Sequence, residues 1–355
     1  MMQSLIFTLT PADNLQAETE RMSPRGGIFV LCDENTARLA YPRLAKGCPA
    51  LEHAHLIVVP TGDSNKNLTN LSRVWEQLQQ HGATRHSLLI NLGGGMVTDM
   101  GGFAAATFKR GMRWINVPTT LLGAVDAAVG GKTGINFHGL KNEIGVFAEA
   151  ASVIISPIFF DTLPHKELLS GYAEMLKHAL LQSKSDTDML LEHDVTSIDP
   201  IQMLELLRRS VAVKQRIVEI DPHEKGLRKS LNLGHTFGHA FESFYMNSDT
   251  PVPHGYAVAW GLVCALVMSH LHLQFDASLL RKFAQYVECN YGVPQIRCSH
   301  YDSLLDLMRH DKKNTDSTHI QFTLLNAPGS PEIAQEASED DIKTTLDLMR
   351  DLLHI

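Results

Sequence analysis

The order in which strand-like and helix-like segments follow one another constrains the fold of this chain more than any other feature of its sequence. In the first half, short apolar runs alternate with stretches of helical periodicity. An alternation of this kind, with strands that are apolar throughout, predicts a parallel sheet covered by helices on both faces. The strand-like runs are GIFVLCD (27–33), HLIVVP (55–60), HSLLINL (86–92), MRWINVP (112–118) and ASVIISP (151–157).

The alternation ends near residue 160, and helical periodicity replaces it. We therefore expect an α/β domain at 1–160, followed by a mainly helical domain at 161–355. The predicted fold class is α/β plus all-α. One β-like run, HIQFTLL (319–325), interrupts the helices. The predicted helices lie at 163–181, 197–221, 226–246, 255–273, 277–291 and 338–353.

The composition is that of a globular protein, since 44% of the 355 residues are hydrophobic and 20% are charged. The formal net charge of −8 argues against a general nucleic-acid binder and against a protein that docks on anionic membranes. The five cysteines are scattered and form no CxxC pair. They indicate reduced thiols, a cytoplasmic location and no thiolate zinc site.

Two further segments are candidates for a membrane span and a signal peptide, and neither is expected to be one. The longest apolar run, Tyr256–Met268, has the length of a short core helix, so no run is expected to span a membrane. The first residues, MMQSLIFTLTPAD, lack a basic stretch and a sufficiently long apolar stretch. A signal peptide is therefore not expected.

A glycine triplet, 93–95, follows an apolar strand and opens a helix. Such a turn brings backbone N–H groups and a helix N-terminus to a phosphate or pyrophosphate. It is equally consistent with a tight turn that needs positive φ, because the GxGxxG pattern and a GK[ST] sequence are both missing. Asp99, early in this helix, is either a charge favoured by the helix dipole or a contact to a ribose.

The segment VGGKTGINFHGLKNEIG (129–145) contains five glycines together with Lys132, Lys141 and Asn142. We expect an irregular loop, which either lies at the surface or wraps a ligand with backbone and lysine donors. Asp126 precedes it in the apolar stretch LLGAVDAAVGG. A carboxylate in such surroundings is costly unless it is paired, which favours a functional role.

Three short patterns together predict a metal site. SGYAEMLKHALL places Glu174, Lys177 and His178 on one helix face, which alone would indicate a surface ion pair. LNLGHTFGHAFE holds His235 four residues before His239, and a further histidine, His254, precedes an apolar helix. One carboxylate and two imidazoles from separate helices make a three-ligand site with an open position, as catalytic zinc requires. HTFGH lacks the glutamate of zinc proteases, which excludes that class.

Nearly the whole chain resembles the 3-dehydroquinate synthases of the shikimate pathway, from the strand before Gly62 to DKKN at 311–314. Several motifs that occur in order carry the resemblance. They are GGGMVTDMGGFAAATFKRG, NVPTTLLGAVDAAVGGKTGIN, GLKNEIGVF, AEMLKHALL, GLRKSLNLGHTFGHAFE and the dipeptide HG at 254–255.

The resemblance implies a homodimeric enzyme with an N-terminal NAD-binding domain and a helical metal-binding domain. It implies that a divalent cation, Zn²⁺ or Co²⁺, binds Glu174, His235 and His254. It also implies that Arg110 reaches the substrate phosphate of the partner subunit. The residues that it assigns to NAD are Asp63, Lys66, Gly94, Gly95, Asp99, Thr119, Thr120, Lys132, Lys141, Phe159 and Thr162. Those that it assigns to substrate and catalysis are Asp126, Lys132, Lys141, Asn142, Lys177, Lys214, Arg228, Asn232, His239 and Lys312.

The implied reaction converts 3-deoxy-D-arabino-heptulosonate 7-phosphate into 3-dehydroquinate and phosphate. NAD oxidises a ring hydroxyl, phosphate leaves by elimination, the hydride returns, and an intramolecular aldol step closes the new ring. NAD is thus recycled, and the protein chiefly positions charge. Its partner is a small anionic sugar-acid phosphate; neither nucleic acid nor membrane is expected.

Two departures from the family pattern matter. Tyr256 stands where the family commonly has Glu in HGE, which puts support of the metal ligands in question. MGGF replaces the usual LAGF, which we interpret as a packing change. Three rival functions remain: a metal-dependent NAD alcohol or polyol dehydrogenase, a sister sugar-phosphate cyclase, and a non-catalytic binding protein. The dehydrogenase does not account for Lys132, Lys141 and Arg228 together.

Overall fold

The chain divides into two compact units in a computed structural model that describes residues 3–138, 140–195, 197, 199–246, 251–309 and 320–355. The N-terminal unit comprises Met1–Pro164 and Ile198–Val211, and the C-terminal unit comprises His165–Ser197 and Ala212–Ile355. Each unit is described by itself below.

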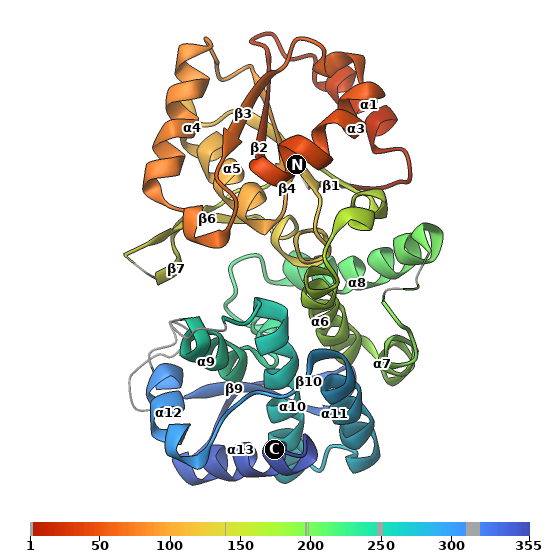
Figure 1. The fold of residues 1–355 in the computed structure, drawn as a ribbon, viewed down its shortest axis with the longest axis vertical. Helices are drawn as coiled ribbons and strands as arrows, with labels where there is room; N and C mark the ends of the chain where they lie inside the picture. The colour runs from red at the N-terminus through yellow and green to blue at the C-terminus, as the bar shows by residue number, and fades with distance from the viewer. Residues whose placement is uncertain (1–2, 139, 196, 198, 247–250, 310–319) are drawn as a thin grey trace. The chain divides into compact units, whose positions relative to one another are not determined.

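A six-stranded sheet forms the core of the N-terminal unit (Figure 1). Its strand order is β1-β8-β5-β4-β2-β3, and all neighbouring strands are parallel. The predicted parallel sheet is therefore confirmed. Every residue of β4 is buried, as expected for a strand covered on both faces. The strands are β1 (Ser4–Phe7), β2 (Ile28–Asp33), β3 (His55–Val59), β4 (Leu88–Gly93), β5 (Arg113–Pro118) and β8 (Ser152–Ile155).

The strand order reverses direction at β2, which pairs with β3 on one side and β4 on the other. In open parallel sheets, ligands bind outside the carboxyl ends of the strands at such a reversal. The glycine triplet lies at the end of β4, so it is at this position. The helices of this unit are α1 (Pro11–Met22), α2 (Glu34–Leu39), α3 (Tyr41–Lys46), α4 (Leu68–Gln80) and α5 (Gly95–Thr107), with short 3₁₀ segments η1 (Pro49–Leu51), η2 (Asp63–Asn65), η3 (Phe108–Arg110) and η5 (Pro157–Thr162).

The expectation of an irregular loop at 129–145 is wrong. The segment forms an antiparallel hairpin of β6 (Lys132–Phe137) and β7 (Leu140–Phe147). Gly134 lies opposite Gly145, and a Cβ atom on Gly145 would come within 2.2 Å of the Thr133 carbonyl oxygen. These two glycines therefore permit a close strand pair here, whereas sequence reasoning treated them as breakers.

The C-terminal unit is mainly helical, with one antiparallel strand pair, β9 (Gln321–Ala327) and β10 (Ser330–Glu336). The β-like run at 319–325 is thus confirmed over the part that the structure describes. Helix α8 (Pro200–Ile220) crosses the boundary between the units. The remaining helices are α6 (His165–Gln182), α7 (Lys184–Leu191), α9 (His235–Met246), α10 (His254–Leu273), α11 (Ala277–Tyr291), α12 (Tyr301–Arg309) and α13 (Glu339–Leu352), with 3₁₀ segments η6 (Leu227–Asn232) and η7 (Cys298–His300).

Two sequence expectations about this unit need correction. The single helix predicted at 226–246 is split into η6 and α9, because Gly234 adopts a φ of +75° just before α9 begins. Helix α10 has 20 residues and is long and apolar enough to cross a membrane, contrary to the expectation that no run reaches that length. Because 72% of its most apolar window is buried inside the protein, it is a core helix in this structure.

Glycines let α9 and α10 approach closely, and this contact sets the positions of the first residues of both helices. An added Cβ at Gly261 would lie 2.1 Å from the Gly234 carbonyl oxygen and 2.6 Å from the Gly238 nitrogen. Since both neighbours are backbone atoms, a side chain at residue 261 has no room unless the helices separate.

We expect Gly261→Ala to lower the free energy of unfolding by about 1–3 kcal/mol, because the added methyl group overpacks this contact. Urea unfolding followed by circular dichroism measures the change. Leu271→Ala, at a position of the same helix that is 44% exposed, serves as the control and should change stability by less than about 0.5 kcal/mol. Equal stability of Gly261→Ala and the unmodified protein would contradict the close packing.

Candidate functional site

A buried carboxylate and two imidazoles come together in the C-terminal unit. Glu174 of α6 is fully buried, and its Oε1 atom lies 3.3 Å from His235 Nε2 and 3.4 Å from His254 Nε2. His235 is the first residue of α9 and His254 the first of α10. The three residues therefore come from three helices, as the sequence predicted.

A lysine completes the charge balance around this carboxylate. Lys177, one turn after Glu174 on α6, is 1% exposed and forms an ion pair with Glu174 Oε2. Burial alone would raise the pKa of the Glu174 carboxyl. Lys177 and the two imidazoles outweigh that effect and hold this pKa well below its ordinary value. Glu174 is therefore an anion that can act as a ligand.

The outer nitrogen of each imidazole has its own partner. His235 Nδ1 lies 3.0 Å from the Leu233 carbonyl oxygen, and His254 Nδ1 lies 3.2 Å from Glu242 Oε2. If each Nδ1–H donates to these acceptors, each Nε2 lone pair is left facing Glu174, which is the arrangement seen around metal-binding histidines. Sequence reasoning missed Glu242, although it lies on α9 three residues after His239 and seven after His235.

The donor set fits a divalent cation. The ligand atoms of Glu174, His235 and His254 lie within 4.8 Å of one another. Both oxygens of Glu174 are buried; Oε2 is paired with Lys177, and Oε1 faces the two imidazole Nε2 atoms, where a cation would be shared by all three side chains. His239, Glu242 and His254 form a second group with the same spacing. The first group fits better, because its carboxylate is fully buried and its two Nε2 atoms point at one oxygen.

Tyr256 does not take the place of the glutamate that is common in the family. Its ring packs edge to face on Tyr291, with centroids 5.2 Å apart, and Lys166 Nζ lies 5.8 Å from its centroid. Glu242 of α9 places a carboxylate next to His254. The effect of Tyr256 on the metal ligands stays a prediction.

Several residues predicted to bind substrate lie in the same unit. Lys214 and Arg228 are 7% and 3% exposed, which is unusual for such long cations. Arg228 Nη1 donates to the Pro222 carbonyl oxygen at 2.6 Å, and Asn232 Nδ2 donates to Glu224 at 3.2 Å. The ring of His239 packs edge to face on His235, with centroids 5.3 Å apart. Lys312 lies outside the described residues.

A second polar cluster lies in the N-terminal unit around Lys66, which is 4% exposed. Its Nζ donates to Asp99 Oδ2 at 3.0 Å and to Asn142 Oδ1 at 2.5 Å, and it lies 3.5 Å from Asp63 Oδ1. Lys141 Nζ lies 3.9 Å from Asp63 Oδ2. The hairpin thus brings Lys141 and Asn142 to residues predicted to bind a cofactor.

Within this cluster, burial and the neighbouring charges shift the pKa of the Asp99 carboxyl in opposite directions. Burial raises the pKa of the Asp99 carboxyl; Lys66 lowers it, and the nearby Asp126 raises it further. Asp126 lies on a π-helical turn, η4 (Gly123–Ala127). Turns of this type frequently occur at functional sites.

The two turns that follow β4 and β5 lie side by side. Gly93 pairs with Pro118 at the ends of these strands, and the Thr119 N–H donates to the Gly93 carbonyl at 3.0 Å. A Cβ atom on Gly94 would meet the Thr120 side chain at 3.0 Å. Gly94 is the N-cap of α5 and has no side chain to cap it, so the first N–H groups of this helix are available to an anion.

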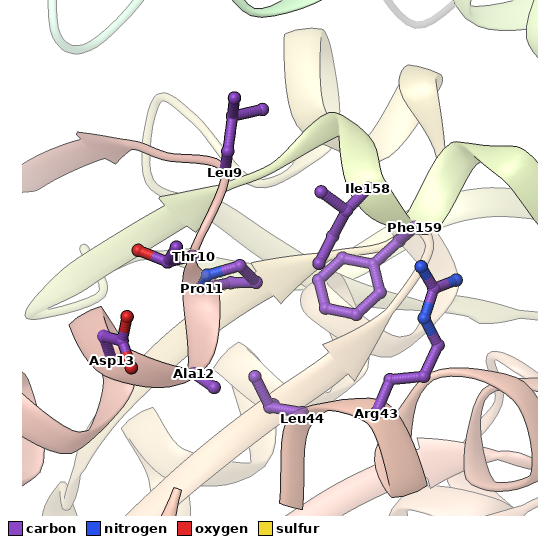
Figure 2. Close-up of a pocket in the computed structure, with 9 residues that line it drawn as sticks. All are labelled: Leu9, Thr10, Pro11, Ala12, Asp13, Arg43, Leu44, Ile158 and Phe159. Atoms are coloured by element: carbon purple, nitrogen blue, oxygen red, sulfur yellow. The ribbon is translucent and has the colours of Figure 1, made fainter. Parts of the chain in front are cut away.

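A pocket of about 240 Å³ lies next to Phe159, one of the residues predicted to contact NAD (Figure 2). Apolar side chains, including Pro11, Leu44 and Ile158, line it together with Arg43. Arg43 forms an ion pair with Asp161, with 2.7 Å between Nη1 and Oδ1. Thr162, also a predicted NAD contact, is exposed, and its hydroxyl donates to the Phe159 carbonyl.

Arg110 and Lys132 are exposed on the N-terminal unit. Lys109 and Arg110 have φ values of 49° and 64°, so two successive residues other than glycine adopt the left-handed region. Such strain occurs preferentially at functional positions. The roles assigned to both residues stay predictions.

The sequence matches two family profiles over consecutive segments. Residues 56–170 match the 3-dehydroquinate synthase N-terminal profile, and residues 171–314 match the C-terminal profile. The chain belongs to the 3-dehydroquinate synthase family.

Individual relatives agree with this family assignment. A 3-dehydroquinate synthase of Parabacteroides distasonis is 47% identical over 324 residues, which cover 91% of each chain. The structure of ValA, a 2-epi-5-epi-valiolone synthase of Streptomyces hygroscopicus with NAD⁺ and Zn²⁺ bound, has a TM-score of 0.87 at 25% identity and covers 99% of this chain and 97% of its own. A 2-deoxy-scyllo-inosose synthase complexed with carbaglucose-6-phosphate, NAD⁺ and Co²⁺ has a TM-score of 0.84 at 20% identity, with 98% and 96% covered, and supports the fold.

The metal affinity of this family member should increase with pH. Burial alone would lower the pKa of His254, but Glu174 and Glu242 raise it to about 10 in the metal-free protein. A cation must displace this proton, so below that pKa we expect about one proton released per cation and an affinity that rises about tenfold per pH unit. Titration calorimetry with Zn²⁺ at about pH 8 in buffers of different ionisation heat counts the protons.

Glu242→Gln tests whether this proton release depends on the carboxylate beside His254. The amide cannot stabilise the protonated imidazole, so fewer protons should be released and the affinity should depend less steeply on pH. The affinity of the deprotonated site should fall about 10–100-fold, because His254 is less well oriented. Glu167→Gln, at an exposed position of α6, is the matched control and should leave both quantities unchanged. Zinc binding without proton release in the unmodified protein would contradict the assigned environment of His254.

Proposed function

We propose that this protein is a 3-dehydroquinate synthase, which converts 3-deoxy-D-arabino-heptulosonate 7-phosphate into 3-dehydroquinate and phosphate. Membership of the family and the 47% identity to a curated synthase support the reaction. The single structural observation that carries it is the buried group of Glu174, His235 and His254 with Lys177 beside it.

Glu174, His235 and His254 would hold a divalent cation, Zn²⁺ or Co²⁺. When bound, the cation would polarise oxygens of the substrate. Leu233 and Glu242 orient the two imidazoles through their outer nitrogens, so both rings are positioned before any ligand arrives. Lys177 balances the charge of Glu174 and supplies a cation beside the position of the substrate.

Residues 1–160 would bind NAD, which would accept and return a hydride when bound, so that no net NADH forms. The uncapped N-terminus of α5 at Gly94 and Gly95 would take the pyrophosphate. Lys66 and its polar neighbours would contact polar groups of the cofactor. The ring of Phe159 lines a pocket and would contact the cofactor there. The other proposed NAD contacts are Asp63, Asp99, Thr119, Thr120, Lys132, Lys141 and Thr162.

The substrate carries a carboxylate and a phosphate, so it needs local cations although the chain is net acidic. Lys214 and Arg228 are buried cations. Burying a charge costs free energy, and a bound anion would offset that cost by pairing with these side chains. His239 would serve the phosphate end. The remaining proposed substrate residues are Asp126, Lys132, Lys141, Asn142, Lys177, Asn232 and Lys312, with Arg110 contributed by the second copy of a homodimer. We also propose a cytoplasmic location.

A coupled assay tests this function. With the heptulosonate phosphate, NAD and Zn²⁺ supplied, inorganic phosphate should appear while absorbance of NADH stays flat. We expect Glu174→Ala, His235→Ala and His254→Ala each to lower phosphate release at least about 10³-fold, because each removes a cation ligand. His272→Ala, on the same helix as His254 but paired with Asp341, is the control and should retain activity.

The same assay separates the rival functions. NADH that accumulates with a simple polyol would favour a dehydrogenase, and turnover of another sugar phosphate in preference would favour a sister cyclase. A variant without Glu174, His235 and His254 that still releases phosphate at the unmodified rate would refute the proposal. Zinc content measured on each variant shows whether lost activity follows lost metal.

A further inference from the structure

Asn136 lies at a bulge in the β6–β7 hairpin, and the proposed reaction gives it no role. The register shifts between Ile135 and Phe137 of β6, so the one residue between them, Asn136, stands opposite the three residues 141–143 of β7. Bulges interrupt the ladder and re-aim side chains, and they are frequent next to active sites. Two of these three residues are proposed to contact the cofactor or the substrate, so what holds the bulge bears on both.

Asn142, inside the bulge, has a strained backbone that is bonded to Asn136. Its φ of 50° lies in the left-handed region, which residues other than glycine adopt at a cost, although asparagine tolerates it better than most. The Asn142 N–H donates to Asn136 Oδ1 at 2.9 Å. Because the bulge interrupts the ladder at this point, the side chain of Asn136 supplies the acceptor that a neighbouring strand would otherwise provide.

The other end of the Asn136 amide binds the η2 turn. Its Nδ2 donates to the Asp63 carbonyl oxygen at 3.0 Å and to Asp63 Oδ2 at 3.1 Å. The backbone N–H of Asn136 donates to the carbonyl oxygen of Lys66, the C-cap of η2, at 2.7 Å. The partners fix which way the amide faces, because Asp63 offers two acceptors and the Asn142 N–H is a donor.

These contacts close a ring of four residues. From Asn136 the ring runs to Asp63, whose Oδ1 lies 3.5 Å from Lys66 Nζ. Lys66 Nζ donates to Asn142 Oδ1 at 2.5 Å, and the Asn142 N–H returns the ring to Asn136. Three members are proposed to touch a ligand: Asp63 and Lys66 the cofactor, and Asn142 the substrate. Asn136 is the fourth member, and it joins the two sets.

We propose that Asn136 is a positioning residue that couples the cofactor site to Asn142. It fixes the backbone of Asn142 at the bulge and ties it to the turn that carries Asp63 and Lys66. A cofactor that orders this turn therefore also orders Asn142, the residue that would meet the substrate. The inference rests on the proposed function and adds the residue through which its two sites are linked.

Hydrogen exchange resolved to single amides tests this link. In Asn136→Ala the Asn142 N–H loses its acceptor, and it should exchange at least about 10-fold faster than in the unmodified protein. NAD at saturating concentration should slow this exchange about 10-fold in the unmodified protein. In N136A it should slow the exchange less than about 2-fold, because the connection from Asp63 to Asn142 is gone.

A reversed pair tests the contact with Asp63. Asn136→Asp keeps an oxygen for the Asn142 N–H, but it loses the donor and sets a carboxylate against Asp63, so exchange at Asn142 should again rise about 10-fold. The double variant N136D/D63N restores a donor at residue 63 opposite an acceptor at residue 136. Exchange should then return to within about 3-fold of the unmodified rate, a repair that a merely structural loss at residue 136 would not show.

Asn326→Asp is the matched control. Asn326 of the β9–β10 hairpin also donates its side-chain amide to a carboxylate, that of Glu332, at 2.7 Å. The substitution should leave exchange at Asn142 and its protection by NAD unchanged. Circular dichroism confirms that each variant is folded. In the phosphate-release assay, N136A should raise the KM for the sugar-acid phosphate about 10-fold and lower kcat less than about 3-fold, since no reacting group is removed.

Three results would each overturn the inference. They are unchanged exchange at Asn142 in N136A, equal protection by NAD in N136A and the unmodified protein, and a double variant N136D/D63N no better than N136D. All three are measured without phosphate release. If the unmodified protein released no phosphate but gave the expected exchange results, the proposed reaction would fail and the role of Asn136 would stand.

Discussion

The structure of the C-terminal unit depends on one buried carboxylate. Glu174 lies in the middle of α6 with no exposed surface, where an isolated charge would be very costly. Lys177 follows one helical turn later, and His235 and His254 each begin a helix that meets α6 at this point. Removing any of these partners would leave an uncompensated charge in the core. The unit is therefore built around one carboxylate and two imidazoles that have the spacing of cation ligands.

The packing that creates this centre is backbone against backbone. Gly234, Gly238 and Gly261 allow α9 and α10 to approach until main-chain atoms touch. Because the chain breaks before α9, the Leu233 carbonyl oxygen lies 3.0 Å from His235 Nδ1. Glu242 of α9 lies 3.2 Å from Nδ1 of His254, the first residue of α10. In the N-terminal unit, Lys66 plays a comparable part, since it joins the end of β3, helix α5 and the hairpin. A chain with net charge −8 thus buries several cations, Lys66, Lys177, Lys214 and Arg228.

The sequence predicted the parallel sheet, the glycine turn after β4 and the three candidate ligands, because these follow from periodicity, from residue type and from a family resemblance. It did not predict the hairpin, since five glycines look like breakers until Gly134 and Gly145 are seen to face each other. It did not predict the break at Gly234 or the contact of Glu242 with His254. These features depend on distances between elements far apart in the chain, which local pattern does not contain. The assignments of individual cofactor and substrate residues remain predictions.

The most direct test of the central claim is X-ray absorption spectroscopy at the zinc edge on protein loaded with one equivalent of Zn²⁺. The account predicts a first coordination shell of nitrogen and oxygen atoms at about 2.0–2.2 Å, with the outer-shell scattering of two imidazole rings and no sulfur. A shell that contains sulfur, or the scattering of fewer than two imidazoles, would contradict a centre built from Glu174, His235 and His254.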